Sequence, residues 1–203
     1  MDGTLVDSHD AVESAWTAWA RDNGLDPAVV LAVCHGPDAA TTVRRFRPGI
    51  SEEELARHVA IQLDRETTDT GGVRAAVGAH ELIGWLDSRG VAWGVVTNAD
   101  ARLARARLGA AGIEPPLCVT FDDVEHGKPH PDGYLLGSRR LGAEPWQVAA
   151  VEDSASGLAA ARAAGTVVVA VGGAQEGDVV CRDLCELRTH LAAAWSVSPG
   201  ACD

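Results

Sequence analysis

Apolar runs alternate with helical patterns from about residue 76 onward, and this alternation constrains the fold more than any other feature of the sequence. Strands are predicted at Val91–Val96, Leu117–Val119, Val148–Val151 and Thr166–Val171. Helices are predicted between them, at His80–Ser88, Ala101–Ala111, Pro131–Leu141 and Ser156–Ala164. Strands that alternate with helices form a parallel sheet covered on both faces. The fold class is therefore predicted to be α/β.

The first third of the chain has a different character. From His9 to about Thr70 the pattern is helical, with helix ends or starts at Asn23-Gly24, Asp26-Pro27, Gly36-Pro37-Asp38 and the capping-box sequence Ser51–Glu54. Trp16 and Trp19 recur at helical spacing and are interpreted as core residues. We therefore expect two domains: a core made of residues 1–10 and 76–203, and an all-helical insert made of residues 11–75.

Charge and composition narrow the possible partners. The 203 residues carry 29 acidic and 17 basic side chains, a formal net charge of −12, which disfavours duplex nucleic acid and anionic membranes as partners. No run approaches the ~18 apolar residues of a membrane span, and the first residues lack the pattern of a signal peptide. The five cysteines include no C-x-x-C pair, as expected for idle thiols. A cytoplasmic monomer without nucleic-acid or membrane partners is expected.

Polar residues follow the two strongest strands. Thr97 and Asn98 end one strand, and Glu152, Asp153 and Ser154 end another. Because ligands of open α/β sheets bind outside the carboxyl ends of the strands, these clusters should converge in space. Converging carboxylates stay ionised when a cation lies among them, and oxygen ligands without His or Cys favour Mg²⁺. With Asp2 and the Lys128 ammonium, the set suits phosphoryl transfer.

Four segments in this order resemble the motifs of the haloacid dehalogenase-like hydrolase superfamily: Asp2–Ser8, Val95–Asn98, Gly127–Pro129, and Val151–Ser154 with Gly157. The resemblance covers essentially the whole chain. It implies a Rossmann-like parallel sheet with an inserted helical cap, similar to the sugar-phosphatase and phosphoglucomutase-like branch of that superfamily. Val12–Trp16 and the Cys34–Gly36 turn look closest to its sugar and glycerol phosphatases.

The resemblance also implies roles for individual residues. Asp2 matches the general acid and base, and its backbone carbonyl would face the metal. Thr97 matches the hydroxyl that holds the transferring phosphoryl group, with Asn98 beside it. Lys128 matches the ammonium that neutralises nucleophile and phosphate. The expected Mg²⁺ ligands are Asp2, Asp153 and Glu152, the last directly or through water.

One element of the superfamily pattern has no counterpart in the sequence. The nucleophile of the superfamily is an Asp two residues before the position of Asp2, at the end of a strand near the middle of the sheet. Met1 occupies the position between them. We expect the reading frame to begin upstream and to supply both the strand and the nucleophile; a truncated, inactive chain is the alternative.

Substrate contacts are expected from His35, Arg44 and Asp7, together with Asn98. Arg44 is equally well explained as part of a solvated Arg pair, and Asp7 as a helix cap. His126 and His130 flank Lys128, but their spacing on a Pro-containing loop favours no metal site.

The leading hypothesis is a magnesium-dependent phosphatase that acts on a small sugar or polyol phosphate through an aspartyl-phosphate. A mutase resembling beta-phosphoglucomutase and a non-catalytic phosphometabolite-binding protein are the alternatives. A dehalogenase is disfavoured because Asp2 supplies the acid and base that phosphoryl transfer needs.

Overall fold

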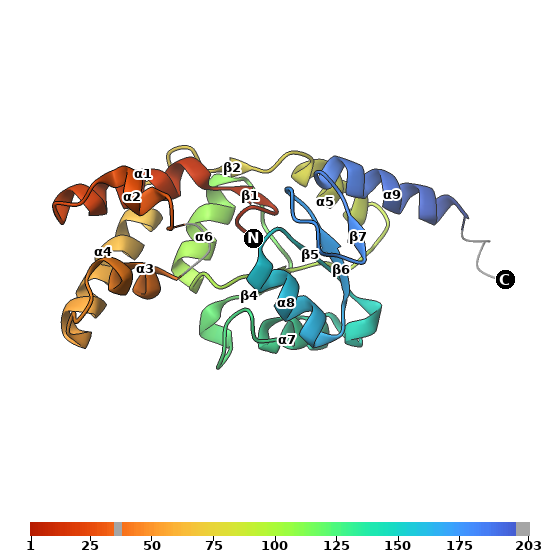
Figure 1. Cartoon of the computed structure of the whole chain (residues 1–203). Helices are drawn as coiled ribbons and strands as arrows, with labels where there is room; N and C mark the ends of the chain where they lie inside the picture. Colours follow the sequence, from red (N-terminus) through yellow and green to blue (C-terminus); the bar gives the residue numbers. More distant parts are fainter. Residues whose placement is uncertain (35–37, 198–203) are drawn as a thin grey trace.

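The computed structural model describes residues 1–34 and 38–197, and these form helices around short, mostly parallel strands (Figure 1). The α-helices are α1 (His9–Asp22), α2 (Pro27–Leu31), α3 (Ala39–Phe46), α4 (Glu52–Thr68), α5 (Ala79–Asp87), α6 (Ala101–Ala110), α7 (Asp132–Leu141), α8 (Ala155–Ala164) and α9 (Leu184–Val197). The strands are β1 (Val6–Asp7), β2 (Arg74–Ala75), β3 (Val95–Val96), β4 (Cys118–Val119), β5 (Ala149–Glu152), β6 (Val167–Ala170) and β7 (Val179–Val180). Two 3₁₀ turns lie at Phe121–Asp123 and Pro145–Gln147.

The parallel strands form two groups. Strand β3 pairs with β4, and β5 pairs with β6, which pairs in turn with β7; all three pairings are parallel. Strands β3 and β5 are therefore both edge strands. A cavity of about 390 Å³ lies between them and is lined by Val91–Val96 from one side and Val148–Val151 from the other. We call this cavity the strand gap.

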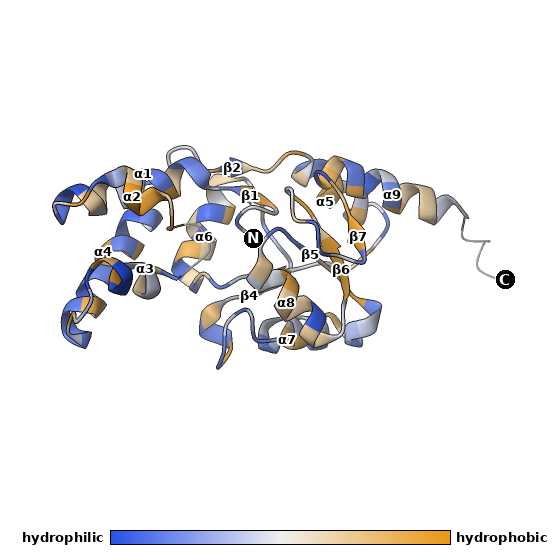
Figure 2. Cartoon of the chain, viewed as in Figure 1, coloured by the Kyte–Doolittle hydropathy of each residue, from blue (hydrophilic) through white to orange (hydrophobic). Residues whose placement is uncertain are grey.

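Helices cover both faces of these strands, as a parallel sheet requires. Helices α5, α6 and α9 contribute Leu82, Leu108 and Leu184 to one buried apolar cluster. Helices α7 and α8 contribute Tyr134 and Leu158 to a second cluster, against β5 and β6. Figure 2 shows apolar residues on β5, β6 and β7.

Helices α1 to α4 form a group of their own beside α6 (Figure 1). Their buried cluster is separate from the two clusters of the sheet and includes Trp16, Trp19 and Val43. The chain enters and leaves this group through the antiparallel pair of β1 and β2, in which Val6 lies opposite Ala75. This pair lies within a few residues of the predicted limits at 10 and 76, and those domain limits stay a prediction.

The α/β fold class is confirmed, and most helix ends agree with the local sequence. Asp26, Asp38 and Ser51 cap α2, α3 and α4, and Ser51 forms the full capping box with Glu54. The burial of Trp16 and Trp19 also agrees with their interpretation as core residues.

The strand predicted at Val91–Val96 is wrong over most of its length, because only Val95 and Val96 form it. Residues 91–94 border the strand gap. A strand exists only where a partner strand completes its hydrogen bonds, and β4 pairs with Val95 and Val96 alone. Strands β1, β2 and β7 and helix α9 were not predicted from the sequence. Among the described residues, no helix is both long and apolar enough to cross a membrane.

Candidate active site

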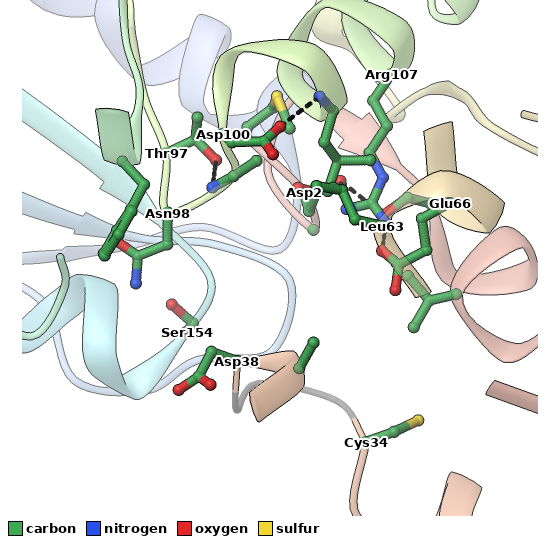
Figure 3. Close-up of a pocket in the computed structure, with 18 of the residues that line it drawn as sticks. Asp2, Cys34, Asp38, Leu63, Glu66, Thr97, Asn98, Asp100, Arg107 and Ser154 are labelled. Carbon is green, nitrogen blue, oxygen red and sulfur yellow. Dashed lines mark hydrogen bonds and ion pairs between the residues drawn. The ribbon is translucent and has the colours of Figure 1, made fainter. Parts of the chain in front are cut away.

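A cavity of about 770 Å³ lies where helices α1 and α4 meet the carboxyl ends of the parallel strands (Figure 3). Most of the residues that the sequence analysis selected line it: Asp2, Asp7, Thr97, Asn98, Lys128, Glu152 and Asp153. These residues come from four separate segments of the chain. The structure therefore confirms that the polar strand ends converge on one cavity.

Lys128 and Glu152 form a buried ion pair at the base of the cavity. Their side chains are 9% and 3% exposed, and the ammonium of Lys128 donates to Glu152 Oε1. The same ammonium donates to the carbonyl of Val96 at 2.8 Å, and Tyr134 donates its hydroxyl to Glu152 Oε1 at 2.5 Å. Burial alone would raise the pKa of Glu152, but the charge of Lys128, the N-terminal ammonium and the hydrogen bonds from Lys128 and Tyr134 together make the net shift downward.

Asp153 is packed against the turn that contains Gly3. Its Oδ1 accepts a hydrogen bond from the Thr4 hydroxyl at 2.7 Å. A Cβ placed on Gly3, whose φ is +72°, would lie 1.9 Å from Asp153 Oδ2, so this approach requires glycine. Burial, followed by the nearby charge of Glu152, raises the pKa of Asp153 above its ordinary value.

Thr97 and Asn98 hold the loops around the cavity. Thr97 Oγ1 accepts a hydrogen bond from the backbone of Ala99 at 3.1 Å, and Asn98 exchanges two hydrogen bonds with the backbone of Lys128. Neither residue caps the following helix, because Asp100 is the N-cap of α6 and accepts from the backbone of Leu103. Asn98 therefore positions the Lys128 loop.

Asp2 is held by residues on both sides of the cavity. Its Oδ1 accepts from the Ser8 hydroxyl at 2.7 Å and lies 3.0 Å from Arg107 of α6. Arg107 also donates to Glu66 of α4 at 2.5 Å (Figure 3). The carboxylate predicted to act as acid and base is thus partly exposed and hydrogen-bonded through one of its oxygens.

The expected substrate contacts divide into three cases. Asp7 lines the cavity but is ion-paired with Arg74 at 2.8 Å. Arg44 does not line it: its guanidinium pairs with Glu52 at 2.9 Å, and both side chains are exposed. The structure thus agrees with the solvated alternative for Arg44. His35 lies outside the described residues.

The inner residues offer oxygen ligands of the kind that Mg²⁺ prefers. Asp153 Oδ2 accepts no hydrogen bond from the described part of the chain, and burial is the main cause of the raised pKa of Asp153. The carboxylate of Glu152 has donors on both oxygens, from Lys128 and Tyr134 on one and from Ser154 at 3.2 Å on the other. The donor set fits a hard divalent cation, with Asp153 as the freer ligand.

His126, His130 and Asp132 lie close together on the loop and helix start around Lys128. Both imidazoles lie within 3.3 Å of the Asp132 carboxylate, and one ligand atom from each residue lies within 4.8 Å of the others. Both histidines are exposed, and they form no part of the wall of the cavity.

Sequence reasoning missed Tyr134, Thr4 and Arg107. Tyr134 and Arg107 lie on amphipathic helices, where a buried side chain follows the same spacing as any core residue. Nothing local marks them as partners of Glu152 and Asp2. Thr4 stands within the first motif, so its position there was the one available signal.

The fold and the cavity define a class first: an α/β protein in which the acidic carboxyl ends of parallel strands surround a lysine. The model of the haloacid dehalogenase-like hydrolase family matches residues 1–165, and the chain belongs to that family. The predicted enzyme class, a phosphatase of that family, is confirmed by this match and by the phosphatases among the relatives.

Two relatives illustrate the similarity. Hexitol phosphatase A of Escherichia coli (strain K12) is 44% identical over 172 residues, which is 84% of this chain and 80% of the relative. Validoxylamine A 7'-phosphate phosphatase of Streptomyces hygroscopicus subsp. limoneus is 32% identical over 201 residues, 93% of each protein.

Solved structures share the fold. A hydrolase from Pseudomonas syringae superposes with a TM-score of 0.81 at 24% identity, covering 95% of each chain. Beta-phosphoglucomutase from Clostridium difficile superposes with a TM-score of 0.77 at 19% identity, covering 95% of this chain and 92% of that one.

Proposed function

We propose that this protein is a magnesium-dependent phosphatase that hydrolyses the monoester of a small polyol or sugar phosphate. The observation that carries the proposal is the convergence of Lys128, Thr97, Asp153 and Asp2 on one cavity. The similarity to hexitol phosphatase A favours an acyclic polyol as the alcohol. Mg²⁺ would be held by Asp153, by Glu152 and by the backbone carbonyl of Asp2, and when bound it supplies positive charge for the phosphoryl oxygens.

Each side chain has a task in this reaction. The Lys128 ammonium is fixed by Glu152 and the Val96 carbonyl, so it presents charge to the phosphoryl group without reorganising. The Thr97 hydroxyl donates to a phosphoryl oxygen. Asp2 gives its proton to the alcohol oxygen as the P–O bond breaks, and it later accepts a proton from the attacking water. Helices α1 and α4 wall the cavity and limit the access of bulk water.

The strand gap supports the proposal that the nucleophile precedes Met1. Two edge strands with apolar side chains face each other across it, and a single β-strand would complete both. Met1 lines the strand gap and the site cavity alike. Its backbone nitrogen is buried, and burial lowers the pKa of this terminal ammonium. The charges of Lys128, Glu152 and Asp153 also act on that pKa, so the nitrogen lies near these three groups. A residue attached to that nitrogen would therefore stand among the phosphoryl-binding groups, where an Asp carboxylate would form the aspartyl-phosphate.

The experiment compares the chain as printed with one extended by the in-frame codons upstream of Met1. Both are assayed with p-nitrophenyl phosphate and with a panel of hexitol and sugar phosphates, with Mg²⁺ and with EDTA. We expect Mg²⁺-dependent turnover from the extended form alone. Asp153→Asn in the extended form is the control for the metal, and its turnover should no longer respond to Mg²⁺.

Other outcomes have defined meanings. Turnover by the printed chain would overturn the assignment of the nucleophile. Turnover by neither form, with inorganic phosphate still bound, would favour the non-catalytic binding protein. Transfer of phosphate to a second position of the sugar, in place of release, would identify a mutase.

We further propose that the protein works as a monomer in the cytoplasm. The described cysteines, Cys34, Cys118, Cys181 and Cys185, are free thiols, which suits a reducing compartment.

A further inference from the structure

Arg107 connects three parts of the molecule that lie far apart in the sequence. It projects from α6, and its guanidinium lies 3.0 Å from Asp2 in the N-terminal segment and 2.5 Å from Glu66 on α4. Figure 3 shows the three side chains in one row along the wall of the cavity. A guanidinium is a planar fork, so it can hold two carboxylates at fixed directions, as a lysine cannot.

Two of the three charged side chains, those of Arg107 and Glu66, are largely removed from solvent. The side chains of Arg107 and Glu66 are 6% and 12% exposed, and that of Asp2 is 31% exposed. Gln62, one turn before Glu66 and fully buried, donates to the other oxygen of Glu66 at 3.0 Å. Buried charges persist only when paired, so neither Glu66 nor Arg107 can move without the other.

The contact with Asp2 orients that carboxylate. Oδ1 of Asp2 is engaged by Arg107 and by the Ser8 hydroxyl, whereas Oδ2 accepts no hydrogen bond from any residue that the structure describes. The carboxylate thus has one anchored oxygen and one oxygen available to carry a proton.

A second ion pair joins the same two helices and offers a matched comparison. Arg102 of α6 and Asp64 of α4 lie 2.7 Å apart, with side chains 54% and 62% exposed. Neither of them lines the site cavity. Loss of this pair would weaken the contact between α4 and α6 without touching Asp2.

From this arrangement we propose that Arg107 is a positioning residue that orients Asp2 for proton transfer and makes that orientation depend on the seating of α4 through Glu66. The inference rests on the proposed phosphatase function. In the step concerned, a carboxylate oxygen of the proposed nucleophile bonds to phosphorus as the P–O bond to the alcohol breaks. The electron pair of the broken bond stays on the alcohol oxygen, and the proton on Asp2 Oδ2 moves to that oxygen. Arg107 itself exchanges no proton in this step.

The test separates positioning from stability by the choice of leaving group. An alcohol needs a proton as it leaves, whereas p-nitrophenolate does not, so misplacement of the acid slows only the first. In the form that turns over p-nitrophenyl phosphate, Arg107→Lys and Glu66→Gln should lower kcat for a hexitol phosphate by about 10- to 100-fold. With p-nitrophenyl phosphate, kcat should change by less than about 3-fold. Arg102→Ala should change neither.

A second measurement needs no activity. Hydrogen exchange of the printed chain should quicken both in residues 2–8 and in α4 for Arg107→Lys, but in α4 alone for Arg102→Ala. Equal losses on both substrates, or a response of Arg102→Ala equal to that of Arg107→Lys, would overturn the role of Arg107. Absence of turnover with p-nitrophenyl phosphate in the unsubstituted protein would instead overturn the phosphatase proposal, and with it the step that Arg107 is said to assist.

Discussion

Replacement of Lys128 by methionine should strongly destabilise the protein at neutral pH. The substitution keeps the length of the side chain and removes its charge, which leaves Glu152 ionised and 3% exposed with only the hydroxyls of Tyr134 and Ser154 as donors. Removing one partner of a buried ion pair costs about 3–5 kcal/mol of unfolding free energy. For a chain of this length, that corresponds to a fall in Tm of roughly 6–20 °C.

The pH dependence of the loss identifies its cause. In the unsubstituted protein Lys128 holds the pKa of Glu152 below its ordinary 4.5, so this carboxylate stabilises the fold above that pH and ceases to do so as the pH falls through its lowered pKa. Without Lys128, burial raises the pKa of Glu152 in the folded state. The destabilisation is then full at high pH and is relieved as protonation neutralises the buried group.

The assay is urea unfolding in EDTA, followed by tryptophan fluorescence, at pH 7 and pH 5. The control is the pair Lys128→Met with Glu152→Gln, which retains volume without any buried charge and should recover most of the lost stability. A loss below about 1 kcal/mol, or the same loss at both pH values with no recovery in the pair, would refute the reasoning, because exposed ion pairs behave in that way.

Three further changes test other parts of the site. Gly157→Ala places a Cβ 2.0 Å from Glu152 Oε2 and should cost about 1–3 kcal/mol in urea unfolding, whereas Gly84→Ala meets nothing within 4 Å and should not destabilise. The pKa of Asp123 is lowered to about 2, chiefly by the Thr120 backbone. Asp123→Asn should therefore reduce stability at pH 7, and the difference should shrink between pH 3.8 and pH 2. Mg²⁺ at a hundredfold excess over its Kd should stabilise the printed chain by about 2.7 kcal/mol in calorimetry; Asp153→Asn should abolish the gain, and an undiminished gain would place the ion elsewhere.

Local chemistry explains which parts of the fold could be predicted from the sequence. Helix starts at Asp26, Asp38 and Ser51 were predictable because a cap bonds to a backbone amide two or three residues away. The strand ends at Thr97 and Glu152 were predictable because buried strands stop where polar residues follow. In each case the information and its structural consequence lie within one short segment.

Contacts between segments that lie far apart in the sequence could not be predicted from it. The pair of β1 and β2 brings residue 6 opposite residue 75, and neither two-residue strand carries an alternating pattern long enough to detect. Arg107 belongs to an Arg-containing helix in which its neighbours at 102 and 105 are exposed, so sequence alone could not select it. Arg44 shows the converse: a basic residue in the insert suits phosphate by its type, and the sequence left the solvated alternative open, whereas its guanidinium pairs with Glu52.

Charge balance links the site residues that were predicted from the sequence with those that were not. Four carboxylates, those of Asp2, Glu66, Glu152 and Asp153, surround the two cations Lys128 and Arg107, and each cation already serves a buried carboxylate. A phosphate monoester would add further negative charge to this excess, and the protein alone offers little to offset it. A divalent cation at Asp153 would remove the excess and draw the phosphoryl group toward Lys128. The excess of carboxylates at the strand ends therefore predicts a bound cation. The same cation allows an anionic substrate to bind, because without it the carboxylates would repel the phosphate.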